Sequence, residues 1–192
     1  MSSKTTKEHI LLSTIDAIEK HGLMNLTTRL IAEEAGVNNA ALHYYFGTKE
    51  HLLDKALNQT AYHMLEDTKT ILESEKPIDI RICEMFEYII EGILRFPNII
   101  RAHLVGPLLY TERQTELSFL LKSWVELASE AIKPHISTEK TAQLKLNLNM
   151  VFSIILISGL LAGPPEEYGW IDLEDVDERR SMLDYATQQI MG

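Results

Sequence analysis

Two short helical segments that end at glycines, between residues 27 and 47, constrain the fold of this chain more than any other feature of its sequence. The first begins at Thr27, whose hydroxyl suits a helix N-cap, and ends at Gly36. The second begins at Asn38, another favourable N-cap residue, and ends at Gly47. Helix, short glycine turn and helix is the layout of a helix-turn-helix, so we expect that motif here.

The rest of the chain also has the periodicity of helices. The 192 residues include only 9 glycines and 6 prolines, and 45% of them are hydrophobic, which permits a packed core. We therefore predict an all-α fold of about nine helices, with a three-helix N-terminal head followed by a helical body. Besides the two segments above, the expected helices cover residues 5–21, 49–72, 77–95, 98–109, 113–133, 138–162 and 174–190.

The sequence favours a cytoplasmic protein without membrane association. One cysteine, Cys83, allows no internal disulfide, which suits a reducing compartment. The N-terminal sequence MSSKTTKEHILLS lacks the long apolar core of a signal peptide. The most apolar stretch, residues 150–162, is interrupted by Ser153, Ser158 and Gly159 and is shorter than the ~18–20 residues that span a bilayer. We interpret this stretch as part of a core or interface helix.

Charge is distributed unevenly along the chain. The formal net charge is -10, but the first 50 residues hold 5 basic and 6 acidic residues, against 13 and 22 in the remainder. An acidic surface repels DNA. Any contact with DNA is therefore expected to be confined to the N-terminal end.

The helix from Asn39 to Phe46 has an outer face that suits DNA. Leu42 and Phe46, four residues apart, are expected to point into the core. Asparagine can pair with an adenine edge, alanine can contact a thymine methyl group, and tyrosine and histidine can donate to phosphate. The residues left on or near the outer face are Asn39, Ala40, His43 and Tyr44.

Lys49 lies in the first turn of the following helix. A cation there is disfavoured by roughly a few tenths of a kcal/mol by the helix dipole, unless an anion lies just beyond. The free amide groups of a helix N-terminus bind phosphate well, and Thr27 and Thr28 open the first short helix in the same way. Two helix starts and a lysine would hold the DNA backbone while the helix between them enters a groove.

These residues resemble the DNA-binding region of the TetR-family transcriptional regulators. The resemblance covers residues 5 to about 53. It implies a homodimer in which each subunit has a DNA-binding head and a body that binds a small molecule. The matching residues are Thr27-Thr28, Ile31-Ala32, Ala35-Gly36-Val37, Leu42, Tyr44, Phe46, Lys49-Glu50 and Leu52-Leu53.

The resemblance also implies roles for individual residues. Contacts with the DNA backbone are expected from Thr28, Asn38, Tyr44 and Lys49. Bases are expected to be recognised by Asn39, Ala40, Ala41 and His43. The family usually has tyrosine where this chain has His43, so the base preference at that position cannot be carried over. Tyr45 is expected to pack beneath the head instead of contacting DNA.

The body contains candidates for a ligand pocket. His103 shares a helix face with Ile99, Ile100 and Pro107 and is expected to point inward, beside a kink at Gly106-Pro107. A largely apolar cavity with a few polar anchors is the usual form of such a site. The candidate ligand-binding residues are Phe86, Ile90, His103, Pro107, Tyr110, Trp124 and Asn147, although each of them would also serve as an ordinary core residue.

The last two long helices are expected to form the dimer interface, as the resemblance implies. Small residues near position 158 permit close helix approach, and the final helix offers an apolar stripe, so a four-helix arrangement across a two-fold axis is expected. The candidate interface residues are Ile154, Ser158, Met182, Leu183, Ala186 and Ile190.

We therefore expect a helix-turn-helix DNA-binding domain at residues 1–50 and a ligand-binding and dimerisation domain at residues 51–192. The expected function is transcriptional repression that a small apolar effector relieves. One alternative is a DNA-bound interaction protein that recruits a partner and senses no ligand. Another is a helical metal enzyme, but His63 and Asp67 form only one i,i+4 pair, which a solvated face explains, and no catalytic motif is present. We expect no enzyme activity, metal or cofactor.

Overall fold

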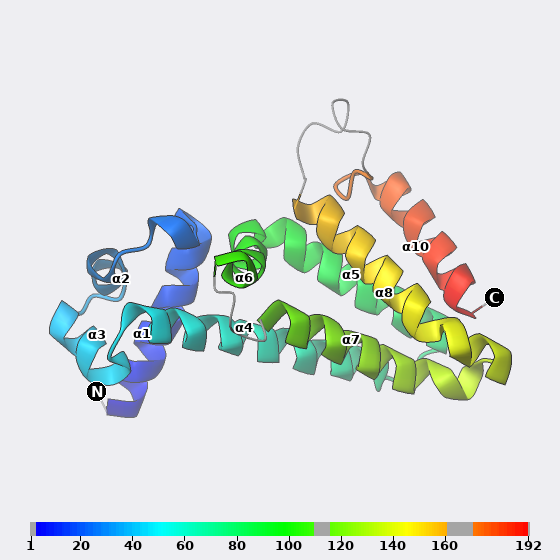
Figure 1. Cartoon of the computed structure of the whole chain (residues 1–192), viewed down its shortest axis with the longest axis horizontal. Coiled ribbons are helices and arrows are strands. Elements are labelled where there is room, and N and C mark those ends of the chain that lie inside the picture. The colour runs from blue at the N-terminus through cyan, green and yellow to red at the C-terminus, as the bar shows by residue number, and fades with distance from the viewer. Residues whose placement is uncertain (1–2, 110–115, 161–170, 192) are drawn as a thin grey trace. The chain divides into compact units, whose positions relative to one another are not determined.

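The computed structural model describes residues 3–109, 116–160 and 171–191. These residues form nine α-helices and two 3-10 helices, with no strand among them, so the all-α prediction is confirmed (Figure 1). The helices are α1 (Ser3–His21), η1 (Leu23–Asn25), α2 (Thr28–Glu34), α3 (Asn39–Phe46), α4 (Lys49–Leu72), α5 (Ile78–Arg95), α6 (Pro97–Leu109), α7 (Glu116–Ile132), η2 (Lys133–His135), α8 (Thr138–Leu160) and α10 (Val176–Met191).

The chain packs as two compact units, each of which is formed by two separate stretches of the sequence. The first unit comprises the described residues of Met1–His63 and Asn98–Leu117, and the second those of Met64–Pro97 and Ser118–Gly192. Helix α4 begins in the first unit and ends in the second. A functional division at residue 50 remains a prediction, whereas the packing division assigns the first half of α4 and nearly all of α6 to the unit that contains the head.

A single apolar core holds the first unit together. The apolar faces of α1, α2 and α3 pack with residues from the first half of α4 and from α6. Leu42 and Phe46 are both buried, as their four-residue spacing predicts, and they fix α3 against this core. The other large buried members are Ile10, Ile18, Leu26, Ile31, Leu52, Leu57 and Ile99.

Polar contacts attach α6 to α1. The carboxylate of Glu19 accepts a 3.0 Å hydrogen bond from the backbone amide of Ile99, and the side-chain amide of Asn98 donates to the Glu19 carbonyl at 2.8 Å. The carboxylate lies where α6 begins, so it supplies both an acceptor and a negative charge to that helix terminus. These bonds join residues about 80 positions apart in the sequence.

A second polar contact attaches α6 to α4. The Oγ1 atom of Thr60 lies 2.9 Å from Nε2 of His103, which is 1% exposed. The same hydroxyl donates its hydrogen to the Leu57 carbonyl at 2.8 Å, so it accepts from His103 Nε2–H. The neutral imidazole therefore has an unprotonated Nδ1, and this buried atom has no hydrogen-bond partner. Burial lowers the pKa of His103 to about 4.

The second unit contains α5, α7, α8 and α10 around an aromatic core. The ring of Phe152 contacts Phe86 edge-on at 5.3 Å and stacks on Trp124 at 5.7 Å between centroids. Helix α10 packs against both α5 and α8. Asn147 on α8 donates a 3.0 Å hydrogen bond to the carbonyl of Gln189, which satisfies one of the free carbonyl groups at the end of α10.

The small residue Gly159 permits a close contact within the chain. A Cβ atom at this position would overlap the side chain of Ile93 on α5, so the absence of a side chain lets α8 approach α5. Close approach at this part of α8 was expected across a subunit interface. The structure shows it inside the second unit instead.

Candidate nucleic-acid interface

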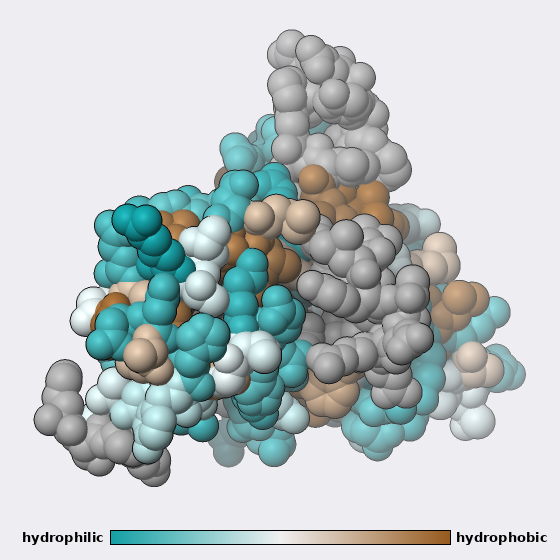
Figure 2. All heavy atoms as spheres, turned by 60° about the vertical axis from the view of Figure 1, so that its left-hand side comes forward, coloured by the Kyte–Doolittle hydropathy of each residue, from teal (hydrophilic) through white to brown (hydrophobic). Residues whose placement is uncertain are grey.

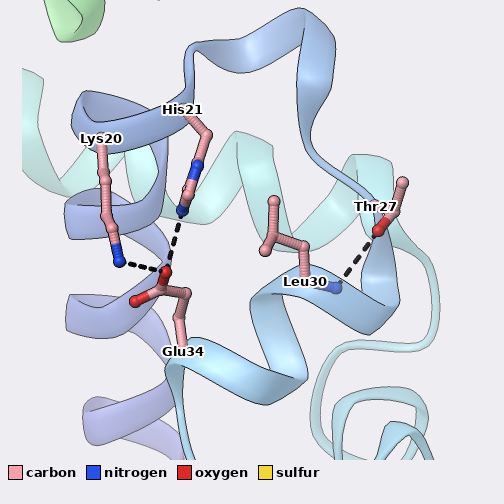
Figure 3. Close-up of polar contacts among 5 residues, drawn as sticks. All are labelled: Lys20, His21, Thr27, Leu30 and Glu34. Carbon is pink, nitrogen blue, oxygen red and sulfur yellow. Dashed lines mark hydrogen bonds and ion pairs between the residues drawn. The ribbon is translucent and has the colours of Figure 1, made fainter.

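Helix α2 is held against the end of α1 by a cluster of charged groups. One carboxylate oxygen of Glu34 accepts hydrogen bonds from Lys20 at 2.6 Å and from Nε2 of His21 at 2.8 Å (Figure 3). The bond from Lys20, followed by that from His21, lowers the pKa of the Glu34 carboxyl group. A further bond from His9 to the Ala35 carbonyl at 3.1 Å fixes the other end of the contact.

The turn between α2 and α3 is a Schellman motif. Val37 N–H donates to the Ala32 carbonyl at 2.9 Å, and Gly36 N–H donates to the Glu33 carbonyl at 3.1 Å. Gly36 has φ 61°, a conformation that glycine adopts without the steric cost of a Cβ atom. The predicted helix-turn-helix is thus present, and the glycine in its turn has the expected role.

Three successive helix starts are capped by side-chain oxygens. Thr27 Oγ1 accepts from Leu30 N–H at 3.1 Å (Figure 3), and Asn38 Oδ1 accepts from Ala41 N–H at 2.9 Å. Thr48 Oγ1 caps α4 in the same way, at 3.1 Å from His51 N. Because each cap uses an oxygen as acceptor, the hydroxyl hydrogens of the threonines and the amide hydrogens of Asn38 remain available for phosphate oxygens.

Helix α3 leaves a polar face uncovered. Asn39, Ala40 and His43 are exposed, and Tyr44 is 81% exposed. Tyr45 is half-buried, packs against the core of the first unit and meets the ring of Tyr44 edge-on at 5.0 Å. Figure 2 turns the side with the head toward the viewer and shows a mainly hydrophilic surface there.

The start of α2, the end of α3 and the start of α4 converge on one small hollow. It is lined by Thr28, Leu42, His43, Gly47, Thr48, Lys49 and Leu52. The Lys49 ammonium donates a 2.6 Å hydrogen bond to the Leu26 carbonyl, which lies just before α2. The carbonyl oxygen thus compensates the cation at this helix start, a partner that the sequence did not indicate. The ammonium retains two further hydrogens for an anion.

The structure brings together three of the nine residues predicted to contact DNA. Thr28, His43 and Lys49 line the same hollow, whereas Ala41 is half-buried. Two residues at this surface were not among the predicted contacts: Thr48, which caps α4, and Gly47, whose carbonyl binds the imidazole of His43.

The described ligand-binding candidates are divided between the two units. Phe86, Ile90 and Trp124 are buried in the core of the second unit, and His103 is buried in the first. Asn147 is bonded to the end of α10. Helix α6 runs through Pro107, and Tyr110 lies outside the described residues.

The dimer-interface candidates fall into two groups. Ser158, Leu183, Ala186 and Ile190 are buried by their own chain. Ile154 is 43% exposed and Met182 is half-buried. Burial within the subunit leaves the first group without surface to offer a second copy, so any interface on α8 depends on its outward face.

The structure also bears on a membrane span and on a metal site, neither of which the sequence favours. Helix α8 passes the length and composition test for a span, but 44% of its most apolar window is buried inside the protein, and one such helix is weak evidence. Asp67 accepts a 2.7 Å hydrogen bond from Tyr88, so it is not simply a solvated residue. Among the described residues, no three His, Cys, Asp or Glu side chains are grouped to hold a metal ion.

Comparison with known proteins agrees with this geometry. Residues 10–56 match the family "Bacterial regulatory proteins, tetR family". A TetR transcription regulator from Haloarcula marismortui aligns with a TM-score of 0.72 at 18% identity, over 97% of both chains. The fatty acid degradation regulator FadR from Bacillus halodurans gives 0.68 at 17%, over 97% of this chain and 94% of its own. RolR, in complex with resorcinol, gives 0.61 at 12%, over 97% and 87%.

The N-terminal head is a helix-turn-helix, and residues 10–56 match the tetR family of bacterial regulatory proteins. Along nearly its whole length, the chain shares the all-α fold of a solved TetR transcription regulator. The resemblance noted in the sequence is thus confirmed, and the family match supports DNA-binding regulation.

Proposed function

We propose that the protein is a homodimeric, cytoplasmic transcriptional repressor that a small, largely apolar effector releases from its operator. The convergence of three helix termini around Lys49 is the observation that carries the DNA-binding part of this proposal. Backbone amides, hydroxyl groups and an ammonium group, gathered beside the exposed face of α3, are the donors that hold a DNA backbone while a helix enters the major groove.

An exposed apolar stripe supports the homodimer. Leu146, Met150, Ile154 and Ile157 follow one another along α8 at intervals of three or four residues, and each is between 41% and 60% exposed. These intervals place them on one face of the helix. Continuous apolar surface of this kind marks an interaction site more often than a solvated face. A two-fold axis at this face would pair two copies of α8.

The dimer is what gives the head its function. Two recognition helices must lie about 34–36 Å apart to enter successive major grooves on one side of the DNA. A dimer whose recognition helices are separated by another distance can place only one of them in a major groove at a time. An effector that binds such a conformation preferentially would lower the population that fits the operator.

Each unit contains a buried, unpaired polar atom that supports effector binding. Nε1 of Trp124 in the second unit and Nδ1 of His103 in the first are buried and have no hydrogen-bond partner. Buried polar atoms are paired in the large majority of cases, so an unpaired one is a position where a ligand can supply the partner. RolR, which shares the fold, is described in complex with resorcinol, a small aromatic molecule.

Helix α6 is the element that would transmit effector binding to the head. Its first turn is bonded to Glu19 on α1, and His103 is bonded to Thr60 on α4. A shift of α6 would therefore act on two helices that share the core with α2 and α3. These contacts are hydrogen bonds between rigid helices. A small displacement of α6 would therefore also displace α1 and α4, and the packing of the head would have to adjust.

The first experiment is fluorescence anisotropy with a DNA fragment from just upstream of the coding region. We expect specific binding whose affinity falls steeply with salt, because phosphate contacts release counterions. If that fragment fails, selection from random DNA tests for a distant operator. A protein that enriches no sequence from random DNA contradicts the DNA-binding part of the proposal.

The effector and the sign of regulation require a second assay. Resorcinol and medium-chain fatty acids serve as probes in the same anisotropy experiment, and release of labelled DNA is the expected result for a fitting compound. A reporter gene behind the selected operator then measures the sign of regulation. Repression that a releasing compound relieves is the expected outcome, whereas activation by the free protein contradicts the repressor assignment.

A further inference from the structure

The side chain of His43 is held in one orientation by Gly47. The Gly47 N–H donates to the His43 carbonyl at 3.0 Å, and the Gly47 carbonyl lies 2.7 Å from Nδ1 of the His43 ring. Gly47 has φ 73° and ψ -71°, a backbone conformation that residues with a Cβ atom rarely adopt. The turn that ends α3 thus also fixes the imidazole at the surface predicted to contact bases.

This contact determines which ring nitrogen carries the proton. A carbonyl oxygen has no hydrogen to donate, so the bond to Gly47 requires a hydrogen on Nδ1 of His43. A neutral imidazole has a single N–H, and its other nitrogen is an acceptor. Nε2 therefore presents a lone pair. His43 is exposed, and no described residue hydrogen-bonds to Nε2.

We propose that His43 recognises a base through an exocyclic amino group in the major groove, either N4 of cytosine or N6 of adenine. This inference rests on the proposed function, in which α3 is the recognition helix. Among the base edges in the major groove, only these two amino groups donate hydrogen bonds. A phosphate oxygen is excluded as the partner of the neutral ring, because both atoms would be acceptors.

Protonation reverses the preference of the same atom. With a hydrogen on both nitrogens, Nε2 becomes a donor, and its partners become O6 or N7 of guanine, O4 of thymine, or a phosphate oxygen. Around the imidazole lie the hydroxyl of Thr28 on α2, the hydroxyl of Thr48 just before α4, and the cation Lys49 on α4, which is the one charged residue among those that line the hollow.

Two variants separate the two nitrogens of the ring. In His43→Asn, the side-chain amide can still donate to the Gly47 carbonyl but is too short to present an acceptor where Nε2 lies. In His43→Gln, the longer amide reaches the position of Nε2 and offers both a donor and an acceptor at every pH. Circular dichroism is the check that both variants are folded.

The test is a base-substitution scan of the selected operator, measured by anisotropy at pH 8. For the wild-type protein, we expect one position per half-site at which adenine or cytosine on the contacted strand is preferred by about 2- to 10-fold, the effect of one hydrogen bond. His43→Asn should lose the preference. His43→Gln, whose amide offers both a donor and an acceptor, should accept guanine or thymine at that position as well.

Each contradicting result leads to a different conclusion. A scan that is identical for the wild type and His43→Asn overturns the inference, while specific binding leaves the proposed function standing. A second contradicting result is a wild-type preference for guanine or thymine at pH 8 that is lost in His43→Asn. This result would show that Nε2 is a donor, and it would also overturn the inference. Absence of any sequence-specific binding contradicts the proposed function itself.

Discussion

The ammonium group of Lys49, in the first turn of α4, donates a 2.6 Å hydrogen bond to the backbone carbonyl of Leu26, which lies two residues before α2 begins. Leu26 is buried, and the lysine is half-buried. The bond therefore ties the start of α4 to the loop that positions the start of α2. A residue expected to hold phosphate is also part of the structure of the head.

Replacement of Lys49 by methionine should therefore have two effects. The free energy of unfolding should fall by about 1–2 kcal/mol, because a charge-assisted bond to a backbone carbonyl is lost. The slope of log affinity against log salt should become shallower by about 1, because one phosphate contact is lost. Urea unfolding and anisotropy at several salt concentrations measure these two quantities.

Lys55→Met is the matched control for this prediction. Lys55 lies on the same helix and is exposed, so the change in charge is the same but no bond to a backbone carbonyl is lost. We expect its stability to remain within about 0.5 kcal/mol of the wild type. Equal effects of the two substitutions would mean that net charge, and not the Leu26 contact, determines the behaviour of Lys49.

The contact of Lys49 with Leu26 is an example of a feature that the sequence could not predict, whereas local features could be predicted. The caps Thr27 and Asn38 and the turn at Gly36 were predicted correctly, because each depends on residues within a few positions of itself. The bond from Lys49 spans 23 residues and the bond from Ile99 to Glu19 spans 80. Such contacts depend on how helices pack, and helical periodicity contains no information about them.

The same reason explains the dimer-interface candidates. Helical spacing identified apolar positions such as Leu183 and Ala186 on α10, and both are indeed on a buried face. However, a helix in a bundle buries its most apolar face against its own chain first. The outward stripe that includes Leu146 and Met150 becomes visible only once the packing of α8 is known.

Gly47 and Gly92 should respond oppositely to alanine substitution. Added Cβ atoms meet nothing within 4 Å at either position, so backbone conformation decides the result. Gly47 has φ 73°, and Gly47→Ala should cost about 1–2 kcal/mol and also displace the imidazole of His43. Gly92 lies inside α5, where alanine is favoured over glycine by up to about 1 kcal/mol.

Thermal unfolding of the two variants measures these effects. Gly47→Ala should lower the melting temperature and weaken DNA binding, whereas Gly92→Ala should leave DNA binding unchanged and raise the melting temperature or leave it unaltered. A Gly47→Ala protein that is as stable as the wild type would show that the turn tolerates an L-residue and that Gly47 does not fix His43.

His103 should make the stability of the protein depend on pH in a defined window. Burial lowers its pKa to about 4 in the folded protein, while the unfolded chain has the ordinary histidine value of about 6.5. Between these values, the unfolded chain takes up a proton and the folded protein does not. Falling pH therefore favours unfolding, and this contribution to stability, fully present above about pH 6.5, is lost as the pH falls toward 4.

His103→Phe isolates this contribution, because phenylalanine has a similar shape and no ionisable group. The Thr60 hydroxyl keeps its own acceptor at the Leu57 carbonyl, so no donor is left unpaired. The free energy of unfolding of the wild type should decrease relative to the variant by about 1.4 kcal/mol per pH unit within the window. Parallel curves for the two proteins would show that the buried imidazole is protonated without cost.

Replacement of Ile154 by glutamate tests the outward face of α8 as the dimer interface. Ile154 is 43% exposed, so the substitution should leave the fold intact, but a charge at the centre of an apolar interface loses its hydration when two copies meet. Multi-angle light scattering should give about twice 21.9 kDa for the wild type and about 21.9 kDa for the variant.

The matched control is Ile80→Glu on α5, since Ile80 is 44% exposed and carries the same change in charge. It should remain dimeric. Because a monomer presents one recognition helix where the operator offers two half-sites, Ile154→Glu should also lose specific affinity for the full operator while retaining weak, salt-sensitive binding. An unchanged mass for Ile154→Glu would exclude this face of α8 and direct attention to another surface, such as the exposed side of α10 around Tyr185.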